Sequence, residues 1–482
     1  MLFNSIDFAI FLPVVFAVFW CLNKYLGTKP RNLFLLLASY FFYGCWDYRF
    51  LSLIILSTLV DYFVGRFLAV EKDNFKRKFL LAISVTFNIG LLAFFKYHNF
   101  FVQSLIDSFS FFGFQMKQIW TLNILLPVGI SFYTFQTMSY SLDIYKKTLQ
   151  PTKDFISLAA YVAFFPQLVA GPIERASNLL PQLTKKLSFD REQATDGLKL
   201  ILWGLFKKMV IADSLAPIVD DVFINYQSYP ASTLIMGAVF FGFQIYGDFS
   251  GYSDIAIGTS KLFGVELMSN FKFPYFSRSI GEFWRRWHIS LSLWFRDYLY
   301  IPLGGSKKGK LHGLKNILIV FFISGLWHGA NWTFVFWGLF NALLFIPSFL
   351  LGRNRQHAHS GITALNVPIR EYLQMFLTFT LVTIGWIFFR SPTVNDAFRF
   401  LGKIISDWGY QNYFHPQGYR MIDYFILLAV FVIFELIISS DERRPFKFSS
   451  PLVRFFIYAI IIFSLLLFYD DGSDRSFIYF QF

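Results

Sequence analysis

The chain has 482 residues, of which 55% are hydrophobic, 21% aromatic and only 15% charged. Soluble domains carry about 25% charged residues and about 45–50% apolar ones, so this composition excludes an ordinary soluble protein. The net charge is +13. The basic residues stand in short loops between apolar runs, which indicates orientation of membrane helices rather than binding of nucleic acid.

Apolar runs of about 17–25 residues, long enough to cross a bilayer as helices, repeat along the chain and predict an all-α, multi-pass membrane protein. The N-terminus lacks a basic segment, so Phe8–Lys24 is interpreted as a retained first span and not as a signal peptide. Cys21 and Cys45 fall near opposite membrane faces, which argues against a disulfide. The further predicted spans are Asn32–Trp46, Phe50–Val70, Lys78–Lys96, Leu122–Leu142, Ala194–Pro217, Ala231–Phe249, Tyr372–Phe389, Ile422–Ile438 and Leu452–Tyr469.

Three segments depart from this simple pattern. Phe100–Gln115 is rich in Phe with scattered polar residues, which predicts an interfacial helix. Phe155–Ala170 is short and broken by Pro and Gly, which predicts a re-entrant or interfacial helix. Leu314–Leu351 is too long for one span and predicts two short spans, or a hairpin, that meet near His328. No segment is large enough to form a separate soluble domain, so residues 1–482 are predicted to form one membrane-embedded domain.

The charges of the loops predict the orientation of the spans. Basic residues fill the loop after the first span and the loop after the third, whereas Asp47–Arg49 between them is nearly neutral. The positive-inside rule then places the N-terminus outside and the loop Gly304–Leu311 inside. Arg353 falls inside only if Leu314–Leu351 crosses the membrane twice or re-enters it. The lysines of Ala194–Pro217 fit poorly, because they lie within a predicted span.

The most informative run is FFISGLWHGANWTFVFWGLFNALLF, because His328 lies inside an otherwise apolar stretch. An ionisable side chain at membrane depth is costly, so such residues are rare and usually face a cavity or a partner. One interpretation is a neutral histidine bonded within the helix bundle. The other is a general base, which would deprotonate a hydroxyl as its oxygen attacks a thioester or ester carbonyl, with backbone N–H groups or Asn331 stabilising the oxyanion.

A second histidine, His288, lies in GEFWRRWHISLSLWFRDYLYIPLGG, where aromatic residues alternate with Arg. The run predicts an aromatic-rich basic helix near the cytoplasmic surface. Membrane anchoring and recognition of an anionic group such as phosphate both remain open.

Other motifs carry less information. The sequence GGSKKGKL of Gly304–Leu311 nearly matches a phosphate-binding loop, but Leu311 replaces the required Ser or Thr, so a basic turn is the preferred interpretation. Asp248 and Asp254 are interpreted as structural residues in the first instance. No metal site is predicted. The remaining histidines are all predicted to be solvated, and they are His98, His312, His357, His359 and His415.

Several motifs taken together resemble the membrane-bound O-acyltransferase superfamily, and most of all its bacterial branch of alginate O-acetyltransferases. They occur in the order of that family and cover nearly the whole chain. The matching pieces are LPVGISFYTFQTMSYSLDIY, FFPQLVAGPIER, GLFKKMVIADSLA, QIYGDFSGYSDIAIG, FWRRWHISLSLWFRDYLYIPLGG and GLWHGANWTFVFWG.

The resemblance implies a ring of about 10–12 transmembrane helices with re-entrant or interfacial helices and a central tunnel. It implies that His328 is catalytic and that His288 supports it. The residues expected to bind the donor or to support the histidines are Trp284, Arg285, Arg286, Trp287, Arg296, Asp297, Trp327 and Asn331. The implied donor is a cytoplasmic acyl thioester such as acetyl-CoA, and no tightly bound cofactor is expected.

The resulting hypothesis is an enzyme of the bacterial inner membrane that moves acetyl groups outward for O-acetylation of an envelope polysaccharide or peptidoglycan. A separate extracytoplasmic transferase of the serine-hydrolase type is expected as a partner of this enzyme. Membrane lipid is expected to surround the enzyme itself. Transfer to teichoic acid, a lipid or a peptide is an alternative. A transporter or flippase without chemistry is another, because polar residues within spans suit it equally well.

Overall fold

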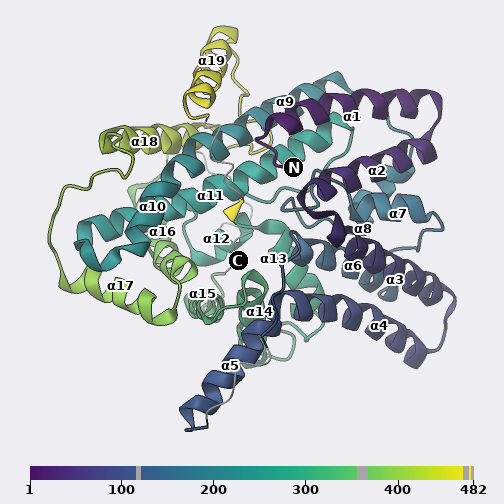
Figure 1. Cartoon of the computed structure of the whole chain (residues 1–482), viewed down its shortest axis with the longest axis horizontal. Helices are drawn as coiled ribbons and strands as arrows, with labels where there is room; N and C mark the ends of the chain where they lie inside the picture. Colours follow the sequence, from purple (N-terminus) through teal and green to yellow (C-terminus); the bar gives the residue numbers. More distant parts are fainter. Residues whose placement is uncertain (115–120, 355–366, 470–476, 479–482) are drawn as a thin grey trace. The chain divides into compact units, whose positions relative to one another are not determined.

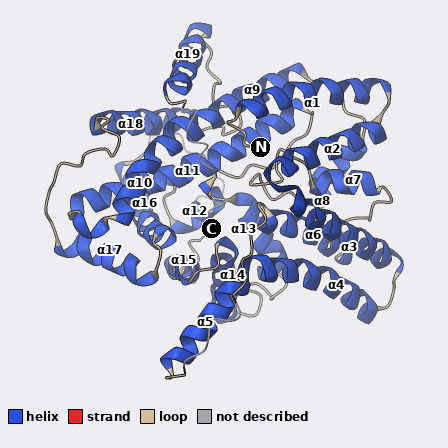
Figure 2. Cartoon of the chain, in the orientation of Figure 1, coloured by secondary structure: helices blue, strands red, loops and turns tan. Residues whose placement is uncertain are grey.

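The computed structural model describes residues 1–114, 121–354, 367–469 and 477–478. Every regular element in these ranges is helical, as Figure 2 shows and as the sequence predicts. Contacts within the chain define two compact units. Unit 1 comprises Met1–Ala194 and Thr259–Met268, and unit 2 comprises Thr195–Gly258 and Ser269–Phe482. The single domain and the ring with a central tunnel stay predictions.

Seven helical stretches in the described part of the chain are long and apolar enough to cross a membrane. The chain is therefore a multi-pass membrane protein, as predicted. Two stretches, Thr28–Val70 with 43 residues and Asn74–Phe111 with 38, each contain two α-helices. The others are Ile6–Tyr25, Lys310–His328, Trp332–Leu350, Ile369–Arg390 and Met421–Ile438. The count of 10–12 spans stays a prediction.

The N-terminal helices of unit 1 follow the predicted spans closely. The predicted interfacial helix Phe100–Gln115 corresponds to α5, although Gln115 lies outside the described residues. The span predicted at Leu122–Leu142 is wrong in its first half, because the helix begins only after Gly129, which adopts a φ of +73°. The helices of unit 1 are α1 (Ile6–Tyr25), α2 (Thr28–Asp47), α3 (Leu51–Val70), α4 (Asn74–Leu92), α5 (His98–Phe111), α6 (Ile130–Tyr145), α7 (Phe155–Val162) and α8 (Ala176–Thr184).

A buried polar cluster holds α3, α4 and α6 together in unit 1. The carboxyl group of Asp61, only 1% exposed, accepts hydrogen bonds from the hydroxyls of Ser84 and Ser141. The side-chain amide of Asn88 donates to its second oxygen over 2.8 Å. Polar side chains within these spans therefore bond neighbouring helices, as such residues commonly do in membrane proteins.

Unit 2 contains the remaining helices. The segment predicted as the span Ala194–Pro217 lies within an uninterrupted helical stretch, in which a π-helical segment at Phe206–Asp213 joins α9 to α10. The helices are α9 (Arg191–Leu205, in unit 2 from residue 195), α10 (Ser214–Ile224), α11 (Ala231–Leu262, in unit 2 up to residue 258), α12 (Ile280–Arg286), α13 (Ile289–Phe295), α14 (Lys310–His328), α15 (Trp332–Leu350), α16 (Ile369–Arg390), α17 (Val394–Ser406), α18 (Met421–Ile438) and α19 (Pro451–Leu467).

The π-helical segment explains the lysines that fitted the sequence pattern poorly. Lys207 pairs with Asp254 of α11 at 2.6 Å, and Lys208 pairs with Asp248 of the same helix at 2.7 Å. Lys208 also reaches Asp213 at 2.8 Å. A buried charge is tolerated when an opposite charge replaces its lost hydration, so these pairs join α11 to the π-helical segment. The structural interpretation of both aspartates is confirmed.

Helices α14 and α15 form an antiparallel hairpin, as predicted for Leu314–Leu351 (Figure 1). Each has 19 residues, so both are full spans rather than short ones. Their backbones approach closely at glycines. A Cβ atom at Gly338 would lie 2.3 Å from the carbonyl oxygen of Phe321, and one at Gly325 would lie 2.4 Å from that of Phe334. Small residues permit this approach in membrane helices.

Replacement of Gly338 by Ala should destabilise the hairpin. The added methyl group would overlap the α14 backbone, and overpacking of this kind costs about 1–3 kcal/mol. Melting temperatures of the detergent-solubilised protein measure the loss. Gly402→Ala in α17 is the matched control, because a Cβ atom there meets nothing within 4 Å. Equal melting temperatures for the two variants would contradict the close approach of the α14 and α15 backbones at Gly338.

Candidate active site

His328 is the last residue of α14, at the turn of the hairpin. The turn is fixed on the α15 side by Asn331, whose side-chain oxygen accepts a hydrogen bond from the backbone N–H of Thr333 at 3.0 Å. Gly329 follows the histidine, and a Cβ atom there would lie 2.1 Å from the ring of Phe334. The local sequence thus forces the chain to turn directly after His328.

His288 lies at a break between two short helices. The run predicted as one helix divides into α12 and α13, and His288 stands between them with a φ of +42°. Left-handed backbone is uncommon outside glycine and concentrates at functional sites. Trp287, which is fully buried, packs its ring 4.9 Å from that of Trp386 and anchors the break.

The two histidines lie side by side in an aromatic environment. Their ring centroids are 6.3 Å apart, and the residues are 1% (His288) and 3% (His328) exposed. The ring of Trp327 contacts both histidines, with centroids 5.7 Å from His288 and 5.0 Å from His328. Trp337 lies 4.9 Å from His328, and Phe249 of α11 lies 4.7 Å from His288. The sequence did not place the two histidines together, and the structure does.

Burial determines the protonation state of His288, which lies outside the candidate membrane spans. Desolvation lowers its pKa to about 3, so the imidazole is neutral at physiological pH. Its Nδ1 lies 3.1 Å from the side-chain oxygen of Asn270. The neutral imidazole keeps a lone pair on one ring nitrogen, which a general base requires.

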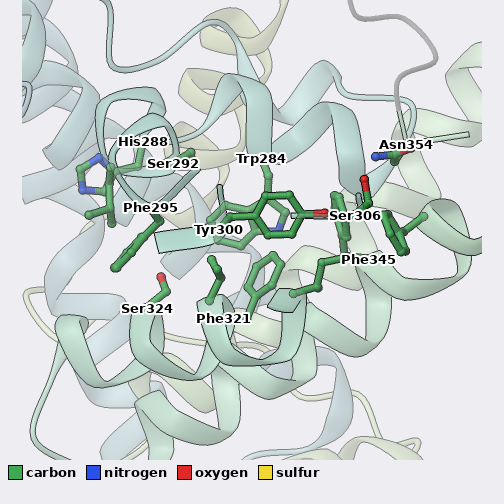
Figure 3. Close-up of a pocket in the computed structure, with 14 residues that line it drawn as sticks. Trp284, His288, Ser292, Phe295, Tyr300, Ser306, Phe321, Ser324, Phe345 and Asn354 are labelled. Atoms are coloured by element: carbon green, nitrogen blue, oxygen red, sulfur yellow. The ribbon is translucent and has the colours of Figure 1, made fainter. Parts of the chain in front are cut away.

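A cavity of about 270 Å³ leads to His288. It is lined on α14 by Ile317, Val320, Phe321 and Ser324, which recur on one face of the helix and end one turn before His328. Figure 3 shows His288 at one end of the lining residues and Asn354 at the other. Tyr300, Ser306, Phe345 and Phe349 complete the distal part. The lining is mostly apolar, with few polar groups, as in many ligand sites.

The basic turn Gly304–Leu311 lies at the distal end of the cavity, where Ser306 contributes to the lining. The turn leads into α14 without a preceding strand, so the phosphate-loop interpretation is not supported. Lys307, Lys308 and Lys310 are all exposed. Residues 298–354 contain no Asp or Glu, so this end of the cavity is strongly basic.

The predicted arginines lie apart from the cavity lining. Arg285 donates to the backbone oxygen of Asn354 at the distal end, so it fixes the cavity wall. Arg286 pairs with buried Glu282 at 2.8 Å. Arg296 and Asp297 pair with each other at 2.6 Å, with Arg296 55% exposed. These contacts are structural in kind, and a role of the four residues in donor binding stays a prediction.

Trp284 and Asn331 have different surroundings. Trp284 lines the cavity, and within the described residues its buried indole N–H makes no hydrogen bond. Asn331 caps α15 with its oxygen and donates from its amide nitrogen to the backbone of Pro392 at 3.1 Å. Its amide donor is therefore engaged, which weakens the suggestion that it stabilises an oxyanion.

Sequence reasoning missed Asn270 and the cavity lining of α14. The spacing of the four α14 residues at i, i+3, i+4 and i+7 was a usable signal for one shared face. Asn270 carried no signal, because a single Asn in a loop has no pattern. Its proximity to His288 follows only from the tertiary fold.

The five other histidines were all predicted to be solvated. The prediction that all five are solvated is wrong for His415, which is 4% exposed and stacks on Tyr424 with ring centroids 5.2 Å apart. His98 and His312 are half-buried, and His357 and His359 lie outside the described residues. Within the described ranges, no three His, Cys, Asp or Glu side chains converge as a metal site would require. Cys21 and Cys45 are unpaired, as predicted.

Comparison with known proteins decides the family. The model of the membrane-bound O-acyltransferase family matches residues 149–388, a range that contains both histidines. A protein of Pseudomonas putida named probable alginate O-acetylase AlgI is 36% identical over 459 residues, which cover 94% of this chain and 90% of the relative. The chain belongs to the membrane-bound O-acyltransferase family. It is therefore an O-acyltransferase, as the sequence motifs implied.

Further relatives of this acyltransferase carry different names. The peptidoglycan O-acetyltransferase of Helicobacter pylori is 35% identical over 440 residues, which cover 84% of this chain and 80% of the relative. The teichoic acid D-alanyltransferase of Streptococcus thermophilus is 28% identical over 309 residues, which cover 57% of this chain and 71% of the relative. The family is thus common to all three, whereas the acyl group and the acceptor in their names differ.

Acidification should destabilise the acyltransferase partly through His288. Its pKa is about 6.5 in an unfolded chain and about 3 in the fold. The unfolded state binds more protons between these values, so stability is lost as the pH falls below about 6.5. At a pH of about 5 this loss is about 2 kcal/mol. The measurement is the drop in melting temperature from neutral pH to that pH, which His288→Gln should reduce.

His98→Gln is the matched control, because this half-buried histidine lies in unit 1 and outside the cluster. It should retain the acid sensitivity of the unmodified protein. An undiminished drop in the His288→Gln protein would show that His288 does not titrate in this way.

Proposed function

We propose that the acyltransferase takes acetyl groups from acetyl-CoA in the cytoplasm and delivers them across the bacterial inner membrane for O-acetylation of an envelope glycan. The names of its relatives support this proposal, since proteins named alginate O-acetylase and peptidoglycan O-acetyltransferase match it over most of their length. The small cavity favours a short acyl group over a long one, because about 270 Å³ lies below the usual range of about 300–1,000 Å³.

The observation that carries the proposal is the course of the cavity along α14. It begins at a basic turn, follows one face of the helix and ends at His288, beside His328. At about 1.5 Å per residue, His328 lies about 27 Å along the helix from Lys310, which is comparable to a hydrocarbon core of about 30 Å. A donor that enters at the basic end would thus bring its acyl group to histidines near the opposite face. His288 would lie there with His328, and not near the cytoplasmic surface as its sequence run predicts.

The basic end suits the phosphates of coenzyme A. Lys307, Lys308 and Lys310 are exposed around the turn, and no acidic residue lies between residues 298 and 354. Lysines bind phosphate as flexible point charges. The positive-inside rule assigns this basic end to the cytoplasm, where acetyl-CoA is available. Farther along the cavity, the indole N–H of Trp284 is positioned to donate to a carbonyl oxygen of the donor.

The histidine pair would supply the acid–base chemistry. His328 accepts the proton of an acceptor hydroxyl as the hydroxyl oxygen attacks the thioester carbonyl. The tetrahedral intermediate then collapses, the carbon–sulfur bond breaks, and the proton passes to the departing thiolate of coenzyme A. His288, at the end of the donor cavity, assists this transfer. The acceptor hydroxyl belongs to the glycan or to an extracytoplasmic partner transferase of the serine-hydrolase type.

Replacement of His328 by Ala should abolish acetylation of the envelope glycan, and His288→Ala should lower it by at least tenfold. Both residues lie where the acyl group would arrive, and loss of a general base costs about 10²–10⁴ in rate. Mass analysis of ester-linked acetyl groups on isolated glycans, normalised to membrane protein level, measures the effect. His98→Ala serves as the control. Unchanged acetylation in the His328→Ala strain would overturn the proposal.

Charge reversal at the basic turn should raise the KM for acetyl-CoA. In the double variant Lys307→Glu and Lys308→Glu, an approximately tenfold rise is expected with little change in kcat, because these residues would meet the phosphates and not the reacting atoms. Release of coenzyme A thiol by the purified protein at low salt measures both parameters. The control carries Lys72→Glu and Lys76→Glu in another exposed basic loop. Equal KM values in the two variants would exclude recognition at this turn.

A further inference from the structure

Asn270 contacts three consecutive residues at the break that carries His288. Its side-chain oxygen lies 3.1 Å from Nδ1 of His288 and accepts a hydrogen bond from the hydroxyl of Ser290 at 2.9 Å. Its backbone oxygen accepts the N–H of Ile289 at 2.9 Å. Asn270, His288 and Ser290 are each 1% exposed. Asn270 thus holds both the imidazole ring and the start of α13.

The orientation of the Asn270 amide follows from its neighbours. The backbone N–H of Ser290 points to the side-chain oxygen at 3.4 Å, and a backbone N–H can only donate. The oxygen of the amide must therefore face this side. The amide nitrogen faces the other way and donates to the hydroxyl of Ser253 at 3.1 Å. Both ends of the amide are consistent with this one orientation.

The amide orientation in turn determines the tautomer of His288. An amide oxygen has no proton to give, so the ring nitrogen that faces it must carry the proton. Nδ1 is therefore the donor, and Nε2 holds the lone pair that accepts a proton during catalysis. The second contact of a histidine commonly selects its tautomer in this way.

We propose that Asn270 is a positioning residue of the acyltransferase, which holds His288 as the Nδ1–H tautomer and leaves Nε2 as the basic nitrogen. This inference rests on the proposed role of His288 in acyl transfer. Asn270 acts through His288 and contacts no substrate. Without it, the imidazole is free to adopt the other tautomer, in which Nε2 is protonated and is no longer a base.

The charges around His288 make a pH readout interpretable. The titratable group that faces it from α14 is His328. On α11, which contributes Phe249 and Ser253, the adjacent carboxylates Asp248 and Asp254 are each paired with a lysine. A carboxylate introduced at position 270 would therefore add a new charge directly against Nδ1.

The experiment compares Asn270→Asp with Asn270→Ala in the purified full-length protein. The Asp variant keeps an oxygen for Nδ1–H and stabilises the imidazolium, so the acid limb of the kcat–pH profile should move up by about one pH unit. The Ala variant should lose at least tenfold in kcat with little change in the KM for acetyl-CoA. Release of coenzyme A thiol from acetyl-CoA is the assay.

Asn23→Asp is the matched control, because it converts another buried Asn, bonded to Arg31 at 3.0 Å, into a carboxylate. Its pH profile should equal that of the unmodified protein. An unshifted profile for Asn270→Asp, or full kcat for Asn270→Ala, would overturn the inference. The position of the acid limb is independent of the amount of protein, and kcat is calculated per mole of folded protein. An active His288→Ala protein would instead refute the proposed role of His288.

Discussion

The cost of removing polar groups from water governs the interior of both units. A buried charge or hydrogen-bonding group costs several kcal/mol unless a partner replaces its hydration. In unit 2, Lys207 and Lys208 meet the carboxylates of α11. In unit 1, Asp61 meets hydroxyl and amide donors from two other helices. The same requirement attaches His288 to Asn270. Polar side chains in this apolar chain thus join neighbouring helices, and one of them holds His288.

The aromatic rings around the two histidines also keep water away from polar groups. Trp327, Trp337 and Phe389 contact the ring of His328, and the cavity ends beside them. Aromatic rings exclude water without offering strong hydrogen-bond acceptors, so few groups other than the two histidines can exchange protons at this end of the cavity.

Much of the architecture was predictable because membrane helices leave a strong pattern. The first span, the hairpin around His328 and the multi-pass character all follow from apolar length alone. Breaks in helices left weaker signals. Trp287–His288 interrupts a run whose composition suits a continuous helix, and the cause is tertiary, since Trp287 packs against Trp386 of α16. Asp248, which pairs with Lys208, and Asn270, which contacts His288, are both distant in sequence from these residues, so no local pattern encodes either contact.

The two sides of α14 differ in the substitutions that they can accept. Gly325 packs against α15 and tolerates no larger side chain, whereas Ile317, Val320 and Phe321 border the cavity. On the proposed function, changes on the cavity side would alter the room available to the acyl group without overlapping the α15 backbone. Selectivity for the transferred group could then change without replacement of His328. Relatives named for acetyl and for D-alanyl transfer are the kind of diversity that such a division permits.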